Sequence, residues 1–348
     1  MYSWIRPLLF RLNAERAHHL TLNALRLAGA LPFGTQLLRS LFEVDDTKLE
    51  VEAFGLKFKN RVGLAAGYDK NGVAIRGLSA LGFGHIEVGT VTRLPQAGNP
   101  KPRVHRVPEA QGLINSMGFP NEGVAALIKQ QPTDDRRPLS VVRRLSSLIG
   151  INIGKGKDTP IERAAEDYCA LLQQVAPFAD YVALNISSPN TMNLRQLQAR
   201  ETILQLLKDV IAVRDALPIK KPVLVKIAPD LNEAELDDVL DAITLTGIDG
   251  VIATNTTIGR EGLPSYAQNF KGGLSGAPLA ARSAQVIRYI HTRTQGALPI
   301  MGVGGIMSPR DAIEKINAGA TLVQIYTGMI YYGPSLVRDI NRAIPTFR

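Results

Sequence analysis

Amide and hydroxyl side chains are concentrated in the segment NISSPN, residues 185–190, which directly follows the apolar run YVAL. The segment holds no histidine, cysteine or carboxylate, so its side chains offer hydrogen bonds to a ligand. Comparable residues follow other apolar runs, and these are Gly67-Tyr68-Asp69-Lys70, Thr90, Asn152, Lys226, Thr254-Asn255-Thr256, Gly304-Gly305 and Tyr326-Thr327. The pattern predicts a binding site of amides, hydroxyls and lysines, with glycines where the backbone approaches the ligand.

Lys226 lies inside the apolar run VLVKIAP, and a lysine buried there needs a charged partner or a chemical role. It could form a Schiff base, as in aldolases, or offset the negative charge of a bound cofactor. Lys70, in GYDKNG, has a simpler alternative as a surface lysine paired with Asp69. The residues alone leave these alternatives open.

Eight short apolar runs carry these residues: VGLAAG (62–67), IEVGTV (86–91), IGINIG (149–154), YVALNIS (181–187), VLVKIAP (223–229), GVIATNT (250–256), IMGVGG (300–305) and LVQIYTG (322–328). Helical patterns follow most of them, which indicates parallel strands buried on both faces. Eight such units over about 270 residues fit an α/β fold of the (β/α)8 TIM barrel type, whose usual size is ~250 residues. A doubly wound open sheet is the alternative.

Two helix starts between these strands are well marked. Ser308 can cap a helix with Pro309 at its first position, and Asn232 can form a capping box with Glu235. The glycine pair after the seventh strand and the YTG segment after the eighth lie where barrels often bind phosphate.

Residues 1–42 form a separate N-terminal extension, which we predict to be two amphipathic helices, the second capped by Asn13. Such helices either pack on their own domain or lie on a membrane surface. The extension does not have the pattern of a signal peptide, and the chain has no run of about 20 apolar residues for a transmembrane helix. We therefore divide the chain into a helical element, 1–42, and a barrel domain, 43–348.

The net charge of +9 is spread along the 348 residues, which weakens a nucleic-acid-binding interpretation. The single cysteine, Cys169, excludes an internal disulfide, and no metal-ligand spacing is present.

Two segments are longer than a minimal barrel requires. Residues 129–148 are predicted to be a solvated excursion, and residues 257–276 a long loop at the catalytic face that could serve as a lid.

Ten motifs occur in order: AAGYDKNG, IEVGTVT, NSMGFPNEG, INIGKGKDT, NISSPNT, VKIAPDL, GVIATNTT, GGLSGAPL, GVGGI and LVQIYTG. Together they resemble the quinone-dependent, membrane-associated class of dihydroorotate dehydrogenases, from about Arg16 to about Pro334. The resemblance implies a TIM barrel that holds FMN and oxidises (S)-dihydroorotate to orotate in pyrimidine synthesis.

The resemblance also implies the cofactor ligands, which are Ala66, Gly67, Thr90, Asn152, Asn185, Lys226, Thr254, Gly276, Gly305, Tyr326 and Thr327. The phosphate would lie at Gly276, Gly305 and residues 326–327. Lys226 would face the N1–C2 edge of the flavin, which favours the cofactor role over the Schiff base.

The implied substrate pocket combines Lys70, for the carboxylate, with amides that suit the ring and with a loop that completes the pocket. Its members are Lys70, Asn115, Ser116, Met117, Gly118, Phe119, Asn185, Asn190, Asn255 and Thr256. Ser116 stands where the family commonly has arginine, Pro120 where it has asparagine, and TMNLR replaces TPGLR. These departures are expected to affect loop packing or mobility.

Ser188 takes the position of the family's catalytic base, where the sister soluble class has cysteine. Strand alternation would point Asn185 and Ser187 the same way, so parity alone selects the wrong serine. The base would take the C5 proton while the hydride at C6 passes to flavin N5, and Thr191 is a candidate to relay the proton.

Serine at this position and the N-terminal helices imply a membrane quinone as the oxidant. His18, Arg106 and Tyr326 match the positions that line the quinone end of a tunnel formed by those helices. The resemblance thus favours the membrane alternative for residues 1–42. It predicts a peripheral protein on the cytoplasmic side of the inner membrane.

Overall fold

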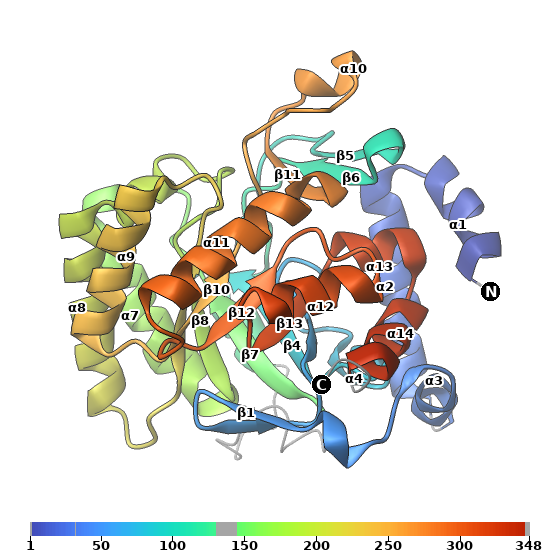
Figure 1. Cartoon of the computed structure of the whole chain (residues 1–348), viewed down its shortest axis with the longest axis horizontal. Coiled ribbons are helices and arrows are strands. Elements are labelled where there is room, and N and C mark those ends of the chain that lie inside the picture. Colours follow the sequence, from blue (N-terminus) through green and yellow to red (C-terminus); the bar gives the residue numbers. More distant parts are fainter. Residues whose placement is uncertain (1, 32, 130–144, 345–348) are drawn as a thin grey trace.

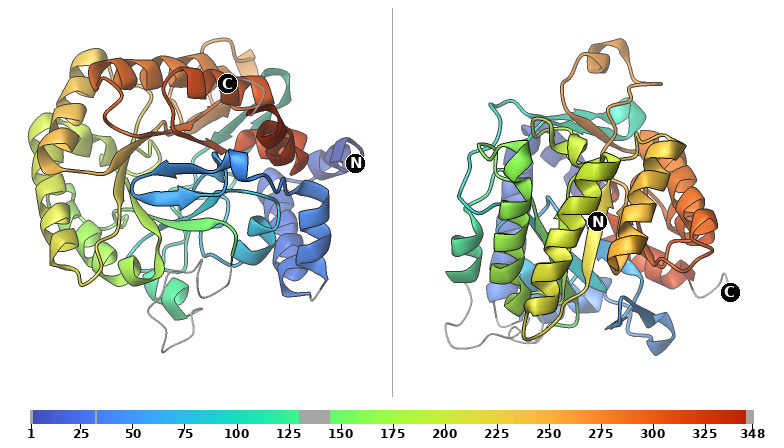
Figure 2. Two further views of the ribbon diagram at one scale, coloured as in Figure 1. Left: turned by 60° about the horizontal axis from the view of Figure 1, so that its bottom comes forward. Right: turned by 90° about the vertical axis from the view of Figure 1, so that its left-hand side faces the viewer.

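The computed structural model describes residues 2–31, 33–129 and 145–344, so most of the predicted excursion at 129–148 lies outside the described residues. Eight parallel strands form a closed barrel (Figures 1 and 2). In chain order they are β3 (Val62–Leu64), β4 (His85–Val91), β7 (Leu148–Ile153), β8 (Tyr181–Asn185), β9 (Val223–Ile227), β10 (Gly250–Ala253), β12 (Ile300–Val303) and β13 (Leu322–Ile325). Each strand falls within or next to one of the eight predicted runs, and β13 pairs with β3 to close the sheet. The predicted TIM barrel is therefore confirmed and the open sheet is wrong.

Helices surround the barrel in the order expected for β/α units (Figure 2). They are α4 (Ile75–Ser79), α5 (Val124–Lys129), α7 (Ala164–Val175), α8 (Arg200–Ala216), α9 (Glu233–Thr246), α11 (Ala280–Arg293), α12 (Pro309–Asn317), α13 (Thr327–Tyr332) and α14 (Ser335–Ala343). Both predicted helix starts are confirmed. Asn232 and Glu235 form a capping box on α9, and the Ser308 side chain accepts the backbone N–H of Asp311 on α12.

A hairpin of β1 (Val51–Ala53) and β2 (Leu56–Phe58) covers the amino-terminal end of the barrel. Phe58 is fully buried, and its ring meets the ring of His85 inside the barrel at 5.4 Å between centroids. Phe54 packs so closely on Gly250 that a Cβ there would lie 2.3 Å from the phenyl ring. This hairpin was not predicted. It closes the end of the barrel opposite the polar strand ends.

A three-stranded antiparallel sheet stands over the opposite end of the barrel (Figure 1). Its strands are β5 (Val104–Val107), β6 (Gly112–Asn115) and β11 (Gly273–Gly276), and a short helix, α10 (Ser265–Gln268), projects beyond it. The prediction of a long loop over 257–276 is wrong for residues 265–268, which form α10, and for the last four residues, because Leu274 pairs with Ile114 across a long sequence separation. The polar composition of residues 257–276 gives no sign of a strand partner so distant in sequence.

The N-terminal extension contains three helices, so the predicted count of two is wrong. They are α1 (Tyr2–Arg11), α2 (Ala14–Ala30) and α3 (Gly34–Phe42). Leu31 is extended and precedes a proline in the sequence, which restricts its backbone and explains the extra break. The predicted cap is confirmed, because the Asn13 side chain accepts the backbone N–H of Glu15. None of the helices in the described ranges is long and apolar enough to cross a membrane.

Candidate functional site

The carboxyl ends of the barrel strands and β6 enclose a cavity of about 940 Å³. It is lined by Ser188 and by all but two of the predicted cofactor and substrate residues: Ala66, Gly67, Lys70, Thr90, Asn115, Met117, Gly118, Phe119, Asn185, Asn190, Lys226, Thr254, Asn255, Thr256, Gly276, Gly305, Tyr326 and Thr327. The structure therefore brings together residues from nearly the whole chain.

Asn152 and Ser116 are the two predicted residues that do not line the cavity. Asn152 is fully buried behind it and accepts a 2.5 Å hydrogen bond from the Thr90 hydroxyl. The Asn185 amide donates to the same hydroxyl at 2.9 Å, and Asn255 donates to Asn185 at 3.1 Å. Asn152 thus orients the polar side chains that do reach the cavity.

Glu87 is the residue that anchors this hydrogen-bonded chain, and the sequence reasoning missed it. Its fully buried carboxylate accepts the Asn152 amide at 2.7 Å and the Gln324 amide at 2.8 Å. The Lys226 ammonium lies 3.9 Å from the same carboxylate. Burial lowers the pKa of Lys226, and the charge of Glu87 opposes that shift. A carboxylate inside the apolar run IEVGTV was the available signal, since a buried lysine calls for such a partner.

Ser188 lines the cavity and Ser187 does not. Strand β8 ends at Asn185, so regular alternation no longer applies at either serine. The Ser187 hydroxyl instead accepts the amide of Asn255 at 3.0 Å, while the Ser188 hydroxyl accepts the backbone N–H of Asn190 at 3.2 Å. The nearby Thr191 hydroxyl is buried without a hydrogen-bond partner among the described residues.

Lys70 is held at the edge of the same cavity, where its ammonium donates to the Gly67 carbonyl at 2.6 Å and contacts the Met117 sulfur at 3.7 Å. Burial is the main cause that lowers the pKa of Lys70 to about 8, and the charge of Arg103 acts in the same direction. Within the described ranges, the Asn190 side-chain oxygen and the Thr256 hydroxyl are buried without partners. An anion with hydrogen-bonding edges would satisfy all three groups.

Glycines form the wall of the cavity beside β12 and β13. Gly304 and Gly305 have φ of 115° and 74°, and a Cβ on Gly305 would lie 2.3 Å from the Cα of Ala280. On the same side, the hydroxyls of Ser275 and Thr327 lie 2.8 Å apart. Backbone N–H groups, hydroxyls and helix N-termini are the groups that bind phosphate at this position in barrels.

A second cavity, of about 1430 Å³, lies between the N-terminal helices and the barrel. Mainly apolar side chains line it, together with His18 and Arg106. Asn115, Met117 and Tyr326 line both cavities, so these side chains form a shared wall. Burial and the charge of Lys70 lower the pKa of His18 to about 3, which leaves its ring neutral at pH 7.

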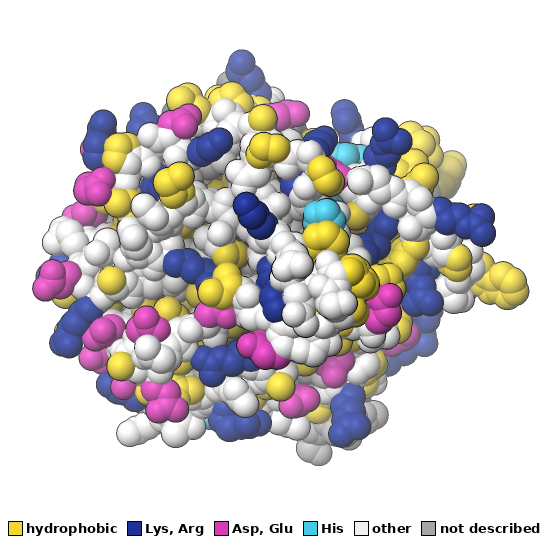
Figure 3. All heavy atoms as spheres, turned by 90° about the horizontal axis from the view of Figure 1, so that it is seen from above, with side chains coloured by type: hydrophobic (Ala, Val, Ile, Leu, Met, Phe, Trp, Pro, Cys, Tyr) yellow, Lys and Arg dark blue, Asp and Glu magenta, His cyan; other side chains and the backbone are white. Residues whose placement is uncertain are grey.

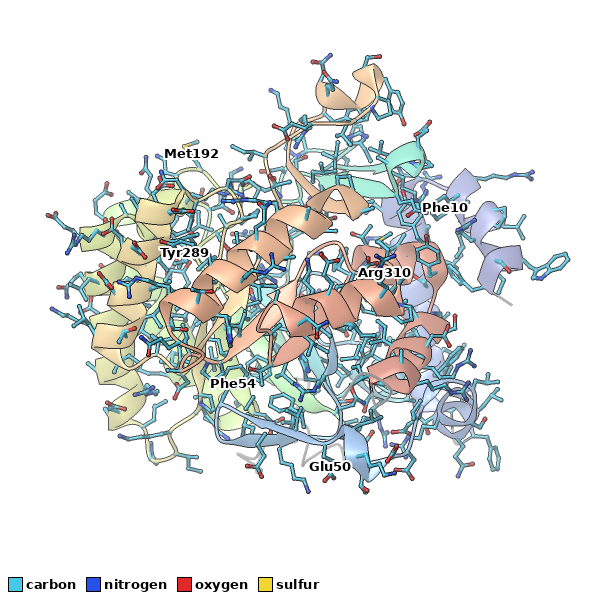
Figure 4. The ribbon with its side chains drawn as sticks, viewed as in Figure 1. Phe10, Glu50, Phe54, Met192, Tyr289 and Arg310 are labelled. Atoms are coloured by element: carbon cyan, nitrogen blue, oxygen red, sulfur yellow. The ribbon has the colours of Figure 1, made fainter. Side chains whose placement is uncertain are left out.

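Arg106 joins the N-terminal helices to β5 at one side of this second cavity. Its guanidinium donates to the Leu12 carbonyl at 2.9 Å and lies 4.6 Å from the centre of the Phe10 ring. Figure 4 shows Phe10 between α1 and the sheet that contains β5. The three predicted tunnel residues, His18, Arg106 and Tyr326, therefore line one space.

Comparison with known proteins identifies the family. A profile described as "Dihydroorotate dehydrogenase" matches residues 48–347. The "Dihydroorotate dehydrogenase (quinone)" of Christiangramia forsetii is 49% identical over 342 residues, which cover 98% of each protein. The protein of the same name from Chromobacterium violaceum is 49% identical over 350 residues, covering 99% of this chain and 97% of that one. This chain belongs to the dihydroorotate dehydrogenase family.

Solved structures agree with this assignment, and family membership makes the chain an oxidoreductase. DHODH from Eimeria tenella, crystallised in complex with ferulenol, is 35% identical with a TM-score of 0.87, covering 97% of this chain and 93% of that one. Its ligand-free form is 36% identical with a TM-score of 0.85, covering 94% and 93%. The family resemblance predicted from the ten motifs is confirmed.

The departures from the family's motifs fall on loops around the cavity. Asn193, where the family commonly has glycine, adopts φ of 57°, a left-handed conformation that asparagine tolerates better than most residues. Figure 4 shows the neighbouring Met192 at the outer edge of the molecule. Ser116 donates its backbone N–H to the Arg103 carbonyl, so the loop is fixed through the backbone at this position.

Across the described part of the chain, no three His, Cys, Asp or Glu side chains gather as a metal site would require.

Proposed function

We propose that this chain oxidises (S)-dihydroorotate to orotate, with FMN in the first cavity and a membrane quinone as the final oxidant. The observation that carries the proposal is the shared wall between the two cavities. One cavity presents Ser188, Lys226 and the amides, and the other is apolar and opens under the N-terminal helices. This arrangement suits a polar substrate and a lipophilic one that react through a single cofactor.

FMN fits the chemistry of the first cavity. Gly276, Gly305 and Thr327 would hold the phosphate, and Thr90, Asn185 and Thr254 would hydrogen-bond the ring system. Lys226 lies on the floor of the cavity with its charge partly balanced by Glu87. Bound FMN would supply the hydride acceptor at its N5 atom and would return two electrons to the quinone.

The substrate would lie between Lys70 and the amides. We propose that the Lys70 ammonium binds the carboxylate, while Asn115, Asn190 and Asn255 bind the ring's donors and acceptors. The Asn190 side-chain oxygen and the Thr256 hydroxyl, which lack partners in the described part of the chain, support this assignment, because a ligand would complete their hydrogen bonding. The remaining substrate contacts would come from Asn185 and from the loop 116–119.

Ser188 is proposed as the base. Oxidation removes a hydride from C6 and a proton from C5 and leaves a double bond between these carbons. The Ser188 hydroxyl would receive the C5 proton as it gives up its own. The buried Thr191 hydroxyl, which has no hydrogen-bond partner among the described residues, is a candidate for the next carrier. The backbone N–H of Asn190 would orient the Ser188 oxygen toward the substrate.

Residues 1–42 are proposed as a quinone-binding and membrane-docking element. Exposed large apolar side chains are concentrated there, and they are Trp4, Ile5, Leu8, Leu12, Leu20, Leu27, Leu31, Phe33, Leu37 and Leu41. Figure 3 shows hydrophobic and basic side chains together on the side where α1 and α2 lie. Such a surface suits peripheral binding to anionic lipid. We place it on the cytoplasmic side of the inner membrane.

Orotate formation with different oxidants tests this function. The purified protein should convert dihydroorotate to orotate, followed by ultraviolet absorbance, when a quinone analogue is present. A water-soluble acceptor such as NAD⁺ should not replace the quinone. Failure to form orotate with any quinone, in a protein that carries flavin, would refute the proposal.

A further inference from the structure

Lys315, on α12, is a buried lysine with no part in the chemistry above. Its side chain is 2% exposed, and its ammonium donates a 2.6 Å hydrogen bond to the Ala280 carbonyl. It forms no ion pair within the described part of the chain; of its acidic neighbours, Asp311 accepts the Met307 backbone N–H and Glu314 is exposed. Burial lowers the pKa of Lys315 to about 8. A buried cation without a carboxylate is costly, so it calls for a balancing charge.

The position of Lys315 relates it to the glycine wall of the first cavity. Ala280 is the first residue of α11, and its backbone packs directly on Gly305. Gly304 and Gly305 line the cavity on their other side. The backbone of Ala280 therefore lies between the Lys315 ammonium and Gly305, whose surface a ligand would touch. Figures 1 and 4 show α12, which carries the labelled Arg310, beside α11.

The electrostatics of this wall favour an anion. The amino-terminal end of the 14-residue helix α11 carries partial positive charge, and the Lys315 ammonium adds a full charge of the same sign beside it. Like charges in a poorly solvated place repel each other unless an anion lies close by. Gly305 lines the cavity and packs on Ala280, the residue at which the helix start and the Lys315 ammonium meet.

We propose that Lys315 is a positioning residue for the cofactor's phosphate group. Its charge complements the phosphate through the Ala280–Gly305 wall, and its hydrogen bond fixes the start of α11 against that wall. This inference rests on the proposed FMN site. A purely structural alternative, in which the hydrogen bond only ties α12 to α11, predicts a loss of stability that does not depend on the ligand's phosphate.

Competition between FMN and riboflavin separates these alternatives, because riboflavin has the same ring system without the phosphate. Each full-length holoprotein is equilibrated with mixtures of the two flavins, and the bound flavins are then quantified by chromatography. Lys315→Gln keeps a donor for Ala280 but removes the charge. We expect its preference for FMN over riboflavin to fall about tenfold, equivalent to about 1.4 kcal/mol.

Matched variants complete the test. Lys315→Arg should keep the wild-type preference, and Arg288→Gln, which removes an exposed charge from α11, should also keep it. If Lys315→Gln does not fold, Lys315→Met takes its place. A weaker preference for FMN over riboflavin in Lys315→Met, but not in Lys315→Arg, then gives the same support. An unchanged FMN preference in a folded, neutral variant overturns the inference. A wild-type protein that binds neither flavin contradicts the FMN site itself, and the inference with it.

Discussion

Single residues divide the work of the first cavity. Ser188, the proposed base, accepts the backbone N–H of Asn190, whereas Lys226 lies beside Glu87 on the cavity floor. Ser188 follows β8, and Lys226 lies on the neighbouring strand β9. Asn185, the last residue of β8, is linked to Glu87 by hydrogen bonds through Thr90 and Asn152. Lys226, Asn152 and Asn185 thus share one polar network that begins at Glu87.

Ser188→Ala should leave the flavin bound and slow its reduction by dihydroorotate by ~10²–10⁴-fold, the usual contribution of a positioned base. Anaerobic stopped-flow absorbance measures the step directly. Ser187→Ala is the matched control, since its hydroxyl does not line the cavity, and its reduction should be slowed much less. Equal rates for the wild type and Ser188→Ala would remove Ser188 from the mechanism.

Lys70 gives a pH prediction. Its ammonium is charged below its pKa of about 8 and neutral above it, so binding of the substrate carboxylate should weaken as pH rises through this value. We expect kcat/KM for dihydroorotate to fall above about pH 8, because this ratio reports the free enzyme. The Lys70→Met variant should have a low kcat/KM without that dependence. A wild-type profile that stays flat from about pH 7 to pH 10 would contradict the assignment.

At the scale of residues, the cavity members that directly follow barrel strands were predictable from the sequence pattern, whereas Asn115, residues 116–119 and Gly276 came only from the family resemblance. Only Asn152 and Ser116 lie off its surface. Glu87 was missed because a carboxylate in an apolar strand gives no local sign of its partners, which come from three other strands. The choice of Ser188 over Ser187 required the family resemblance, since alternation ends with the strand at Asn185.

At the scale of elements, several side-chain hydrogen bonds and a buried ion pair fix the N-terminal helices to the rest of the protein. The Glu15 carboxylate accepts hydrogen bonds from the Arg103 guanidinium at 2.7 and 3.2 Å, and both side chains are buried. Burial raises the pKa of Glu15, but the hydrogen bonds and charges of Arg103 and Lys101 outweigh it and hold the pKa below its ordinary value. Elsewhere the contact is mainly close packing, as where Gly77 of α4 meets the Leu25 carbonyl of α2.

Removal of residues 1–42 should separate the two half-reactions. None of the residues that line the first cavity belongs to this segment, so dihydroorotate should still bleach the flavin. Reoxidation by a lipophilic quinone should slow at least about tenfold, since the second cavity loses much of its wall. Double-mixing stopped flow measures both steps. If flavin reduction and flavin reoxidation slow equally in a truncated protein that stays folded and yellow, residues 1–42 do not serve the quinone step alone and the prediction is refuted.

Trp4→Glu combined with Leu8→Glu should weaken membrane binding, because these side chains are 84% and 61% exposed on α1 and their burial in lipid is lost. Cosedimentation with vesicles that contain anionic lipid should show that the partition constant between vesicles and solution falls at least about tenfold. Leu245→Glu is the control, since Leu245 is 74% exposed on α9. Equal binding by the α1 variant and the wild type would exclude α1 from the docking surface.

Elements whose signals are local were predictable, including all eight barrel strands and the caps at Asn13, Asn232 and Ser308. The β1–β2 hairpin and the β5–β6–β11 sheet were not, because short antiparallel strands depend on partners elsewhere. The break between α2 and α3 follows from a proline that the amphipathic pattern conceals.

At the scale of the whole molecule, a polar and an apolar cavity meet at Asn115, Met117 and Tyr326. The barrel supplies the polar cavity from its strand ends, while the N-terminal helices supply the apolar one. In the proposed function, each substrate would react from its own side of the bound cofactor. We propose that these two cavities form one flavin-dependent enzyme.

The absorbance spectrum of the purified protein under anaerobic conditions tests this claim most directly. We predict a flavin spectrum that dihydroorotate bleaches and that a quinone analogue restores, with one orotate formed per flavin reduced. A protein that contains flavin but keeps its colour in excess dihydroorotate would contradict the account.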